Sequence, residues 1–229
     1  MRVRVLVVLL GVACKPPLGT EVHHHRGQIV LSAAAPQTPT GVTGPYVSVL
    51  DSVGLTMTPA SGSQIVLGRH LSRRDTTASF SVDLQEGTYQ FDARVLSAKR
   101  AVLYAGTGNS VVDRDGFSVD LSVAPQTPVM LVAPDTSHVV VPTGSLGQTT
   151  LVVHNRGIGV LRFSIYDTSQ VSRTQCASVA CFRPSRLADT VIAGASVAVR
   201  IDAIRKFATA IPLTFSSASG DVEVVIHTP

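Results

Sequence analysis

The sequence predicts an all-β fold, in which two tandem antiparallel β-sandwiches follow a signal peptide and a tether. Hydrophobic residues make up 45% of the 229 residues but aromatic residues only 5%, and the apolar residues are mainly Val, Ala, Leu and Ile. This composition, together with abundant Ser and Thr, favours strands over helices. Apolar residues recur at every second position along much of the chain, which is the period of a strand with one buried face. Stretches rich in Gly, Pro, Asn and Ser separate these runs and predict turns.

The chain begins with two basic residues, Arg2 and Arg4, and a short apolar run, Val5–Ala13. A helix that crosses a bilayer needs about 20 apolar residues, so this run is too short to span a membrane. It has the length of a signal-peptide core. The alternative is a buried first strand. The segment Lys15–Thr20 argues against that alternative, because its two prolines cannot donate hydrogen bonds to a strand ladder.

The stretch Leu10-Gly11-Val12-Ala13-Cys14 resembles the lipobox of bacterial lipoproteins. The resemblance implies removal of residues 1–13, a lipid on the thiol of Cys14, and anchoring of the exported chain to the cell membrane or outer membrane. Lipoproteins usually have Leu in the position of Gly11, and here Leu10 lies one position earlier. Ordinary export to the periplasm or the medium is therefore the alternative. Residues 14–26 are predicted to form a tether, and the three adjacent histidines within it are interpreted as polar tether residues.

The chain contains three cysteines. If Cys14 carries lipid, Cys176 and Cys181 are left as a pair, and an oxidising compartment lets a disulfide between them persist. The alternative is a zinc site that includes one of three histidines, namely His138, His154 or His227. The sequence lacks the paired cysteine and histidine spacings typical of structural zinc sites, so we expect a disulfide, no metal and no cofactor.

The charge of the chain is modest. Removing Arg2 and Arg4 with the signal peptide lowers the formal net charge from +4 to +2. No run of basic residues with interleaved aromatic residues is present, so the sequence predicts no nucleic-acid partner.

Residues 27–134 are predicted to form the first sandwich. The segment from Phe80 to Phe91, FSVDLQEGTYQF, resembles the hairpin of prealbumin-like and carboxypeptidase-regulatory-like domains. The resemblance implies a small accessory sandwich in which Gly87 takes a turn conformation with positive φ and Tyr89 points inward. We therefore expect strands at 78–84 and 89–95 to pair as a hairpin. Further strands are predicted at residues 28–33, 47–57, 64–67, 101–104, 117–123 and 129–132.

Residues 135–229 are predicted to form the second sandwich, after a boundary at Ala133–Thr136. The segment Thr150–Phe163 resembles a hairpin of immunoglobulin-like domains of the abnormal-spindle/hydin type, and Ile192–Val199 resembles a later strand of those domains. Ile211–Ile226 fits their closing hairpin. The resemblance implies that the tandem sandwiches are immunoglobulin-like. The second set of strands is predicted at residues 138–141, 148–154, 160–166, 196–203, 210–216 and 221–227.

A long insertion, Asp167–Asp189, departs from this resemblance. Loops of this length are usually functional or disordered. The insertion contains the cysteine pair, an apolar stretch and several arginines. We interpret it as the contact surface for a partner, with five candidate binding residues: Arg173, Val179, Phe182, Arg183 and Arg186.

No catalytic motif is present. The sequence has no G-x-S-x-G nucleophile turn, and the local group of His70, Ser72 and Asp75 is better interpreted as a surface turn. The sequence therefore predicts a lipid-anchored, exported, non-enzymatic binding or structural module of the bacterial cell envelope, with an envelope protein or a glycan as partner. The alternative is a carbohydrate-binding module or an accessory domain of a surface hydrolase, which the lack of Trp makes the weaker interpretation.

Overall fold

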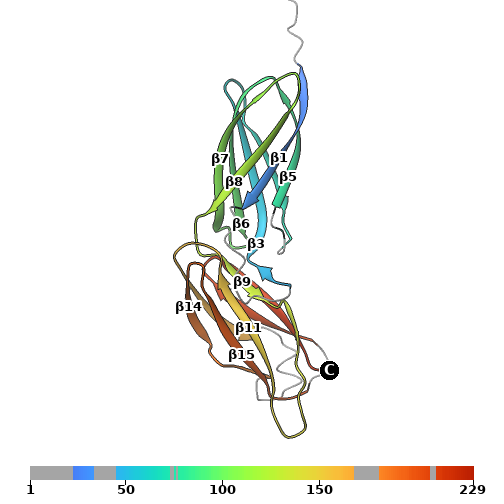
Figure 1. Cartoon of the computed structure of the whole chain (residues 1–229), viewed down its shortest axis with the longest axis vertical. Helices are drawn as coiled ribbons and strands as arrows, with labels where there is room; N and C mark the ends of the chain where they lie inside the picture. The colour runs from blue at the N-terminus through green and yellow to red at the C-terminus, as the bar shows by residue number, and fades with distance from the viewer. Residues whose placement is uncertain (1–22, 34–44, 73–74, 76, 168–180, 207–209) are drawn as a thin grey trace, which may run out of the picture.

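The computed structural model describes residues 23–33, 45–72, 75, 77–167, 181–206 and 210–229. These residues form strands, turns and loops, and none of them is helical, so the predicted all-β class is confirmed. Two β-sandwiches lie end to end (Figure 1). Within the described residues no helix could span a membrane.

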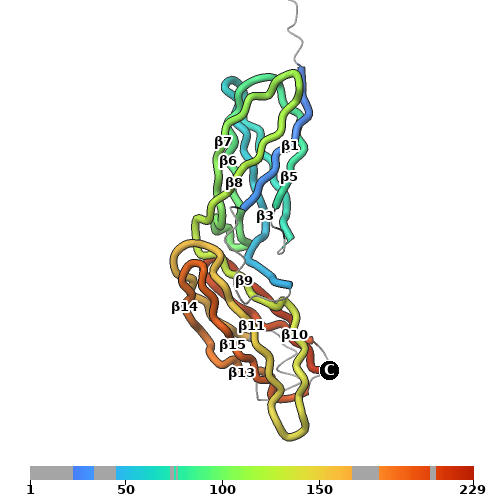
Figure 2. Tube along the Cα trace, viewed as in Figure 1, coloured from blue at the N-terminus to red at the C-terminus, as the bar shows by residue number. Residues whose placement is uncertain are grey.

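The first sandwich is one seven-stranded sheet folded over on itself. Only two residue pairs join β7 to β8, Tyr104 with Pro125 and Ala105 with Ala124, and the sheet turns there. The strands β8, β1 and β5 consequently cover β4, β3, β6 and β7, as the trace in Figure 2 shows. All neighbours are antiparallel except β1 and β8, which are parallel. The strands are β1 (His24–Ala33), β3 (Leu50–Pro59), β4 (Ile65–His70), β5 (Thr77–Gln85), β6 (Gly87–Ser97), β7 (Val102–Val112) and β8 (Phe117–Pro125).

The alternation predicted for β5 and β6 is confirmed, but their pairing as a hairpin is wrong. Phe80 on β5 and Tyr89 on β6 are buried, and Gly87, the first residue of β6, has a φ of +152°. However, β5 pairs with β1, whereas β6 pairs with β3 and β7. Alternation reports which face of a strand is buried and not which strand is its neighbour. Two consecutive strands with apolar inner faces can therefore lie in opposite layers, facing each other across the core.

The second sandwich consists of two five-stranded sheets. One sheet contains β10 (Thr136–His138), β17 (Gly220–His227), β16 (Ile211–Ser217), β12 (Val160–Asp167) and β14 (Ala188–Ile192). The other contains β13 (Phe182–Pro184), β15 (Ser196–Ala203), β11 (Gly147–Asn155), β9 (Met130–Ala133) and β2 (Val47–Ser48). The closing hairpin is confirmed, because β16 and β17 pair with Ile211 opposite Ile226. The hairpin expected within Thr150–Phe163 is wrong, since β11 and β12 lie in opposite sheets.

Two strands that precede the predicted boundary lie in the second sandwich. β9 pairs with β11, and the short strand β2 pairs with β9. The four residues of β9 are all buried, so this strand has no alternation that could have indicated which sandwich it joins. The division of the chain into two sandwich domains, at residues 27–134 and 135–229, stays a prediction.

The first strand begins earlier than expected. His24, His25 and Arg26 were assigned to the tether, but they belong to β1 and lie opposite β5, with His24 paired to Gln85. The ring Nε2 of His25 lies 3.1 Å from Oε1 of Glu86. Pairing with β5 therefore extends β1 beyond its apolar stretch. The predicted signal peptide and the tether residues 14–22 lie outside the described residues.

Candidate functional site at the junction of the sandwiches

The junction is built from backbone contacts between segments far apart in the sequence. Val49, between β2 and β3, donates its N–H to the carbonyl of Met130 at 3.3 Å. The N–H of Asp135 donates to the carbonyl of Pro45 at 3.0 Å. Because the chain passes into the second sandwich at β2, returns at β3 and passes over again at β9, the two units are joined by more than one connection. Their buried apolar side chains form one continuous cluster.

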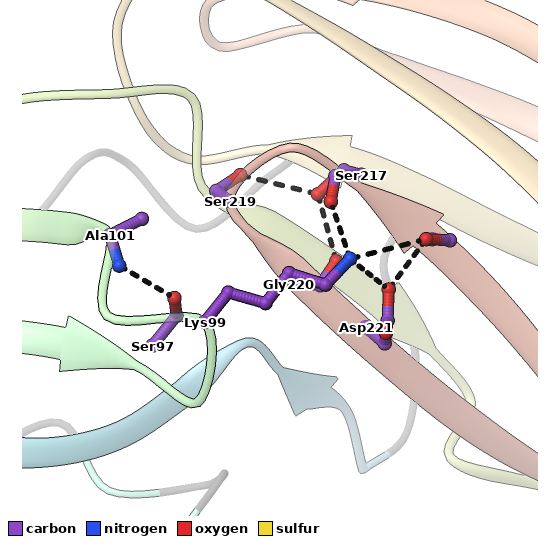
Figure 3. Close-up of polar contacts among 8 residues, drawn as sticks. Ser97, Lys99, Ala101, Ser217, Ser219, Gly220 and Asp221 are labelled. Atoms are coloured by element: carbon purple, nitrogen blue, oxygen red, sulfur yellow. Dashed lines mark hydrogen bonds and ion pairs between the residues drawn. The ribbon is translucent and has the colours of Figure 1, made fainter.

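On one side of the junction, Lys99 reaches from the turn after β6 to the β16–β17 hairpin (Figure 3). Its Nζ lies 2.8 Å from Oδ1 of Asp221 and 3.1 Å from the carbonyl oxygen of Ser217. Gly220 in the same hairpin packs against Val49, since a Cβ added there would lie 2.9 Å from the Val49 Cβ. Lys99 is thus a contact between the two sandwiches.

On the other side, Arg156 extends from the β11–β12 turn toward the first sandwich. Its Nη1 donates a hydrogen bond of 3.3 Å to the Tyr46 hydroxyl, and its guanidinium carbon lies 5.2 Å from the centre of the Tyr46 ring. Tyr104 of β7 lies close by. Burial raises the pKa of the Tyr104 hydroxyl, although the nearby charge of Arg156 opposes this shift. Arg156 and Tyr104 both line a cavity of about 110 Å³ at the end of the first sandwich.

The turn that carries Arg156 is held by the buried side chain of Asn155. Its Oδ1 accepts hydrogen bonds from the N–H groups of Val129 and Gly157, at 3.2 and 3.0 Å. Its Nδ2 donates to the carbonyl oxygens of Gly159 and Val191, both at 3.1 Å. One amide thus satisfies four backbone groups of the turn, the linker after β8 and the edge strand β14, and it fixes the direction of the Arg156 side chain.

His154, the preceding residue, is also buried. Its Nδ1 lies 2.9 Å from Oγ of Ser196, whereas its Nε2 is buried without a hydrogen-bond partner. Burial lowers the pKa of the His154 imidazole below 6.5. The charge of Arg156 acts in the same direction, and a backbone hydrogen bond with Ala195 acts against it. The neutral ring is therefore the form that fits the folded chain.

No family model and no curated protein match this chain. Among solved structures, it resembles WR4, a member of the MSP family from C. elegans, with 12% identity and a TM-score of 0.34 over 44% of this chain and 97% of that chain. It also resembles the adhesin InvE of Yersinia pseudotuberculosis, with 13% identity and a TM-score of 0.29 over 88% of this chain and 58% of that chain. A putative cell adhesion protein from Bacteroides eggerthii is similar with 10% identity and a TM-score of 0.25 over 90% and 80% of the two chains. Similarity at this level assigns no family and no activity.

Several residues predicted to be functional lie outside the described residues, namely Cys14, Arg173, Cys176 and Val179. Cys181 is fully buried, and its disulfide with Cys176 stays a prediction. Phe182 is only 5% exposed. As part of β13 it packs into the core, so it offers no surface to a partner.

The two described arginines of the insertion are exposed. Arg183 lies on β13 opposite Asp202. Arg186 forms an ion pair with Asp189, next to the start of β14. The pKa of the Asp189 carboxyl is lowered, first by the N–H of Thr190 and then by Arg186. The structure does not bring Arg183 and Arg186 together with the residues of the junction.

The three histidines considered as zinc ligands do not converge. The rings of His138 and His227 stack with centres 4.8 Å apart, whereas His154 contacts Ser196. In the described part of the chain, no three His, Cys, Asp or Glu side chains are grouped so that they could hold a metal ion.

Sequence reasoning missed Lys99, Asn155 and Arg156 as residues of one junction. The strands predicted at 148–154 and 160–166 require a turn between them, and a turn is present there. Nothing in the strand pattern indicates that Arg156 meets Tyr46 and Tyr104, because those residues are separated from it by whole strands.

Proposed function

We propose that this chain is an exported, lipid-anchored, non-enzymatic module that binds a partner or supports structure in the bacterial cell envelope. The observation that carries the proposal is the end-to-end arrangement of two sandwiches joined through a packed junction. β1 begins at the end of the first sandwich that is remote from the second (Figure 1). An anchor at Cys14 would therefore attach the first sandwich to the membrane and hold the second one away from it.

The outer end of the second sandwich is the part that such an anchor would present to a partner. The loop between β10 and β11 and the segment after β15 form a hollow of about 540 Å³ there. Two exposed basic residues, Arg205 and Lys206, lie in its wall. Arg183 is exposed on the neighbouring strand β13, beside the end of β15. Positive charge at this end favours an envelope protein or glycan with acidic groups.

Labelling with radioactive palmitate tests the anchor. The wild-type protein should incorporate label and fractionate with membranes, and Cys14→Ser should lose both properties. Label retained by Cys14→Ser would refute lipidation at this residue. Label absent from the wild type would favour ordinary export.

Crosslinking in intact cells tests the partner surface. The double variant Arg205→Glu/Lys206→Glu should lose its crosslinked product, because the reversed charge repels an acidic partner. Arg114→Glu, in the exposed turn between β7 and β8, provides a matched charge reversal on the first sandwich and should retain the product. Loss of the product in both variants, or in neither, would contradict the assignment of the outer end.

A second candidate function, glycan binding, is favoured by one surface of the first sandwich. A polar hollow of about 580 Å³ lies on the outer face of β3 and β6. Gln64 donates to Thr58 at 3.1 Å, and Arg94 pairs with Asp92 at 3.0 Å, so these side chains are held in place. Their amide, hydroxyl and carboxylate groups can bond sugar hydroxyls, but none of the described lining residues is an aromatic platform. A glycan array that shows binding lost in Gln90→Ala would support this function, and an array without signal would exclude it for the glycans printed.

A further inference from the structure

The cavity at the junction has apolar walls that come from both layers of the first sandwich. Leu31 on β1 and Val123 on β8 line it from one layer, and Leu50 and Val95, at the ends of β3 and β6, line it from the other. Its volume is about 110 Å³. A cavity of about 150 Å³ with similar walls is large enough for benzene. The junction cavity is smaller than that but is only partly enclosed, so a molecule of this size fits with part of it outside the cavity.

A cation without a counter-charge lies at this cavity. Among the described residues, Arg156 forms no ion pair with a carboxylate, and its one side-chain hydrogen bond goes to Tyr46. Its Nε is buried without a partner. Asp75 also lines the cavity, but its carboxylate accepts a hydrogen bond of 2.9 Å from the N–H of Ser72 and makes no ion pair with Arg156. A partly buried cation that lacks an anion is costly unless a ligand supplies one.

A second polar group faces the same space. Tyr104 lines the cavity, and its hydroxyl makes no hydrogen bond with any other residue that the structure describes. Because burial raises the pKa of this hydroxyl, it stays protonated at neutral pH and can donate a hydrogen bond. The cavity thus offers one cation and one neutral donor beside an apolar wall.

We propose that the junction cavity binds a small monocarboxylate with an apolar body, such as a short-chain aliphatic or an aromatic acid. The carboxylate accepts hydrogen bonds from Arg156 and the Tyr104 hydroxyl, and the hydrocarbon part contacts Leu31, Leu50, Val95 and Val123. Asp75 disfavours a second carboxylate in the same cavity, so monocarboxylates bind more tightly than dicarboxylates.

Titration of the purified full-length protein with benzoate tests this site, with toluene as an uncharged molecule of similar size. NMR chemical shifts should show saturable binding of benzoate, and benzoate should raise the melting temperature. Arg156→Gln should weaken benzoate binding about tenfold or more, because it removes a hydrogen bond to a charged group. The same variant should leave toluene binding unchanged.

Two further variants separate the site from effects on folding. Tyr104→Phe keeps the buried ring and removes only the hydroxyl, and it should weaken benzoate binding severalfold. Ala33→Phe fills the cavity from β1 and should abolish binding of both molecules, whereas Arg114→Gln in the exposed turn between β7 and β8 should change neither. The proposal is overturned if the wild type shows no saturable benzoate binding, if benzoate and toluene bind equally well, or if Arg156→Gln binds benzoate like the wild type.

Discussion

The two sandwiches differ in what they bury. Among the described strands of the first sandwich, Ser97 is the one polar residue that is buried as a whole, and the buried hydroxyl of Ser52 adds one polar atom. The second sandwich, which includes β2 and β9, buries more polar residues. They are Ser48, Asp135, Ser137, His154, Asn155, Asp202, Thr214, Ser217, Ser219 and Thr228. The first sandwich is therefore specified mainly by alternation of apolar side chains. The second is specified in addition by side chains that satisfy backbone groups at its turns.

This difference predicts unequal sensitivity to substitution. Apolar alternation spreads stability over many contacts, and the loss of one exposed polar group changes little. A buried polar side chain that bonds several backbone groups concentrates stability, because each group left without a partner carries the cost of its desolvation. Substitutions in the two sandwiches test this predicted difference.

Asn155→Ala should have the largest effect. It removes one fully buried amide and leaves four backbone groups without their partner. We expect a loss of about 4 kcal/mol in the free energy of unfolding, measured by denaturant titration. Asn109→Ala, on the exposed face of β7, is the matched control and should cost less than about 0.5 kcal/mol. Equal losses in the free energy of unfolding would show that the buried polar side chains are not what stabilises the second sandwich.

Gly157→Ala should have the next largest effect. An added Cβ would overlap the carbonyl oxygen of Thr127 and lie 2.8 Å from the Cα of Pro128, so backbone must move. We expect a loss of about 2–3 kcal/mol. Gly54→Ala in the first sandwich is the counterpart, because its added Cβ meets nothing within 4 Å. It should stabilise β3 by about 0.5 kcal/mol, and thermal unfolding of both variants should reveal the opposite signs.

The buried histidine predicts a pH dependence confined to the second sandwich. Because burial lowers the pKa of His154 below 6.5, the unfolded chain binds the proton more tightly than the folded chain does. Stability from this residue is complete above the unfolded pKa and falls as the pH drops below it, by at most about 1.4 kcal/mol per pH unit, until the folded pKa is reached. Unfolding free energies measured from pH 7.5 downward should fall less steeply in His154→Gln than in the wild type.

A His154→Gln curve that falls as steeply as the wild-type curve would contradict this prediction. It would show that the burial of this ring is not the cause of the pH dependence.

The smallest effect is expected at the Lys99–Asp221 pair. Both side chains are about two-fifths exposed, at 43% and 40%, so solvent screens their attraction. A double-mutant cycle with Lys99→Met and Asp221→Asn should give a coupling of about 1 kcal/mol or less. A much larger coupling would make the junction, and not the interior of either sandwich, the chief source of stability.

The positions of turns could be predicted from the sequence, but the pairing of the strands beside them could not. The positive φ predicted for Gly87 is present. A turn also lies between the strands predicted at 148–154 and 160–166, where Asn155 accepts a hydrogen bond from Gly157. The partner of each flanking strand could not be predicted, because each turn carries the chain from one layer to the other. Of the hairpins expected, the one at β16–β17 joins strands of the same sheet.

The residues of the candidate site could not be predicted from the sequence as one group. The cavity beside Arg156 draws its wall from strands on both sides of the first sandwich and its cation from the second. No local pattern relates Leu31, Tyr104 and Arg156, since they become neighbours only when the layers close. The insertion at 167–189 was recognisable by length, but the burial of Phe182 follows from the pairing of β13 with β15.

The sequence by itself determined the all-β class, the positions of most strands and the face that each alternating strand buries. Those features depend on a period of two residues, which is a local property of an extended chain. Only the tertiary structure decided which strands pair, that β2 and β9 lie in the second sandwich, and that Arg156 lies at an apolar cavity. Strand edges offer similar backbone hydrogen bonds to many partners, and the choice among them depends on contacts between residues distant in the chain.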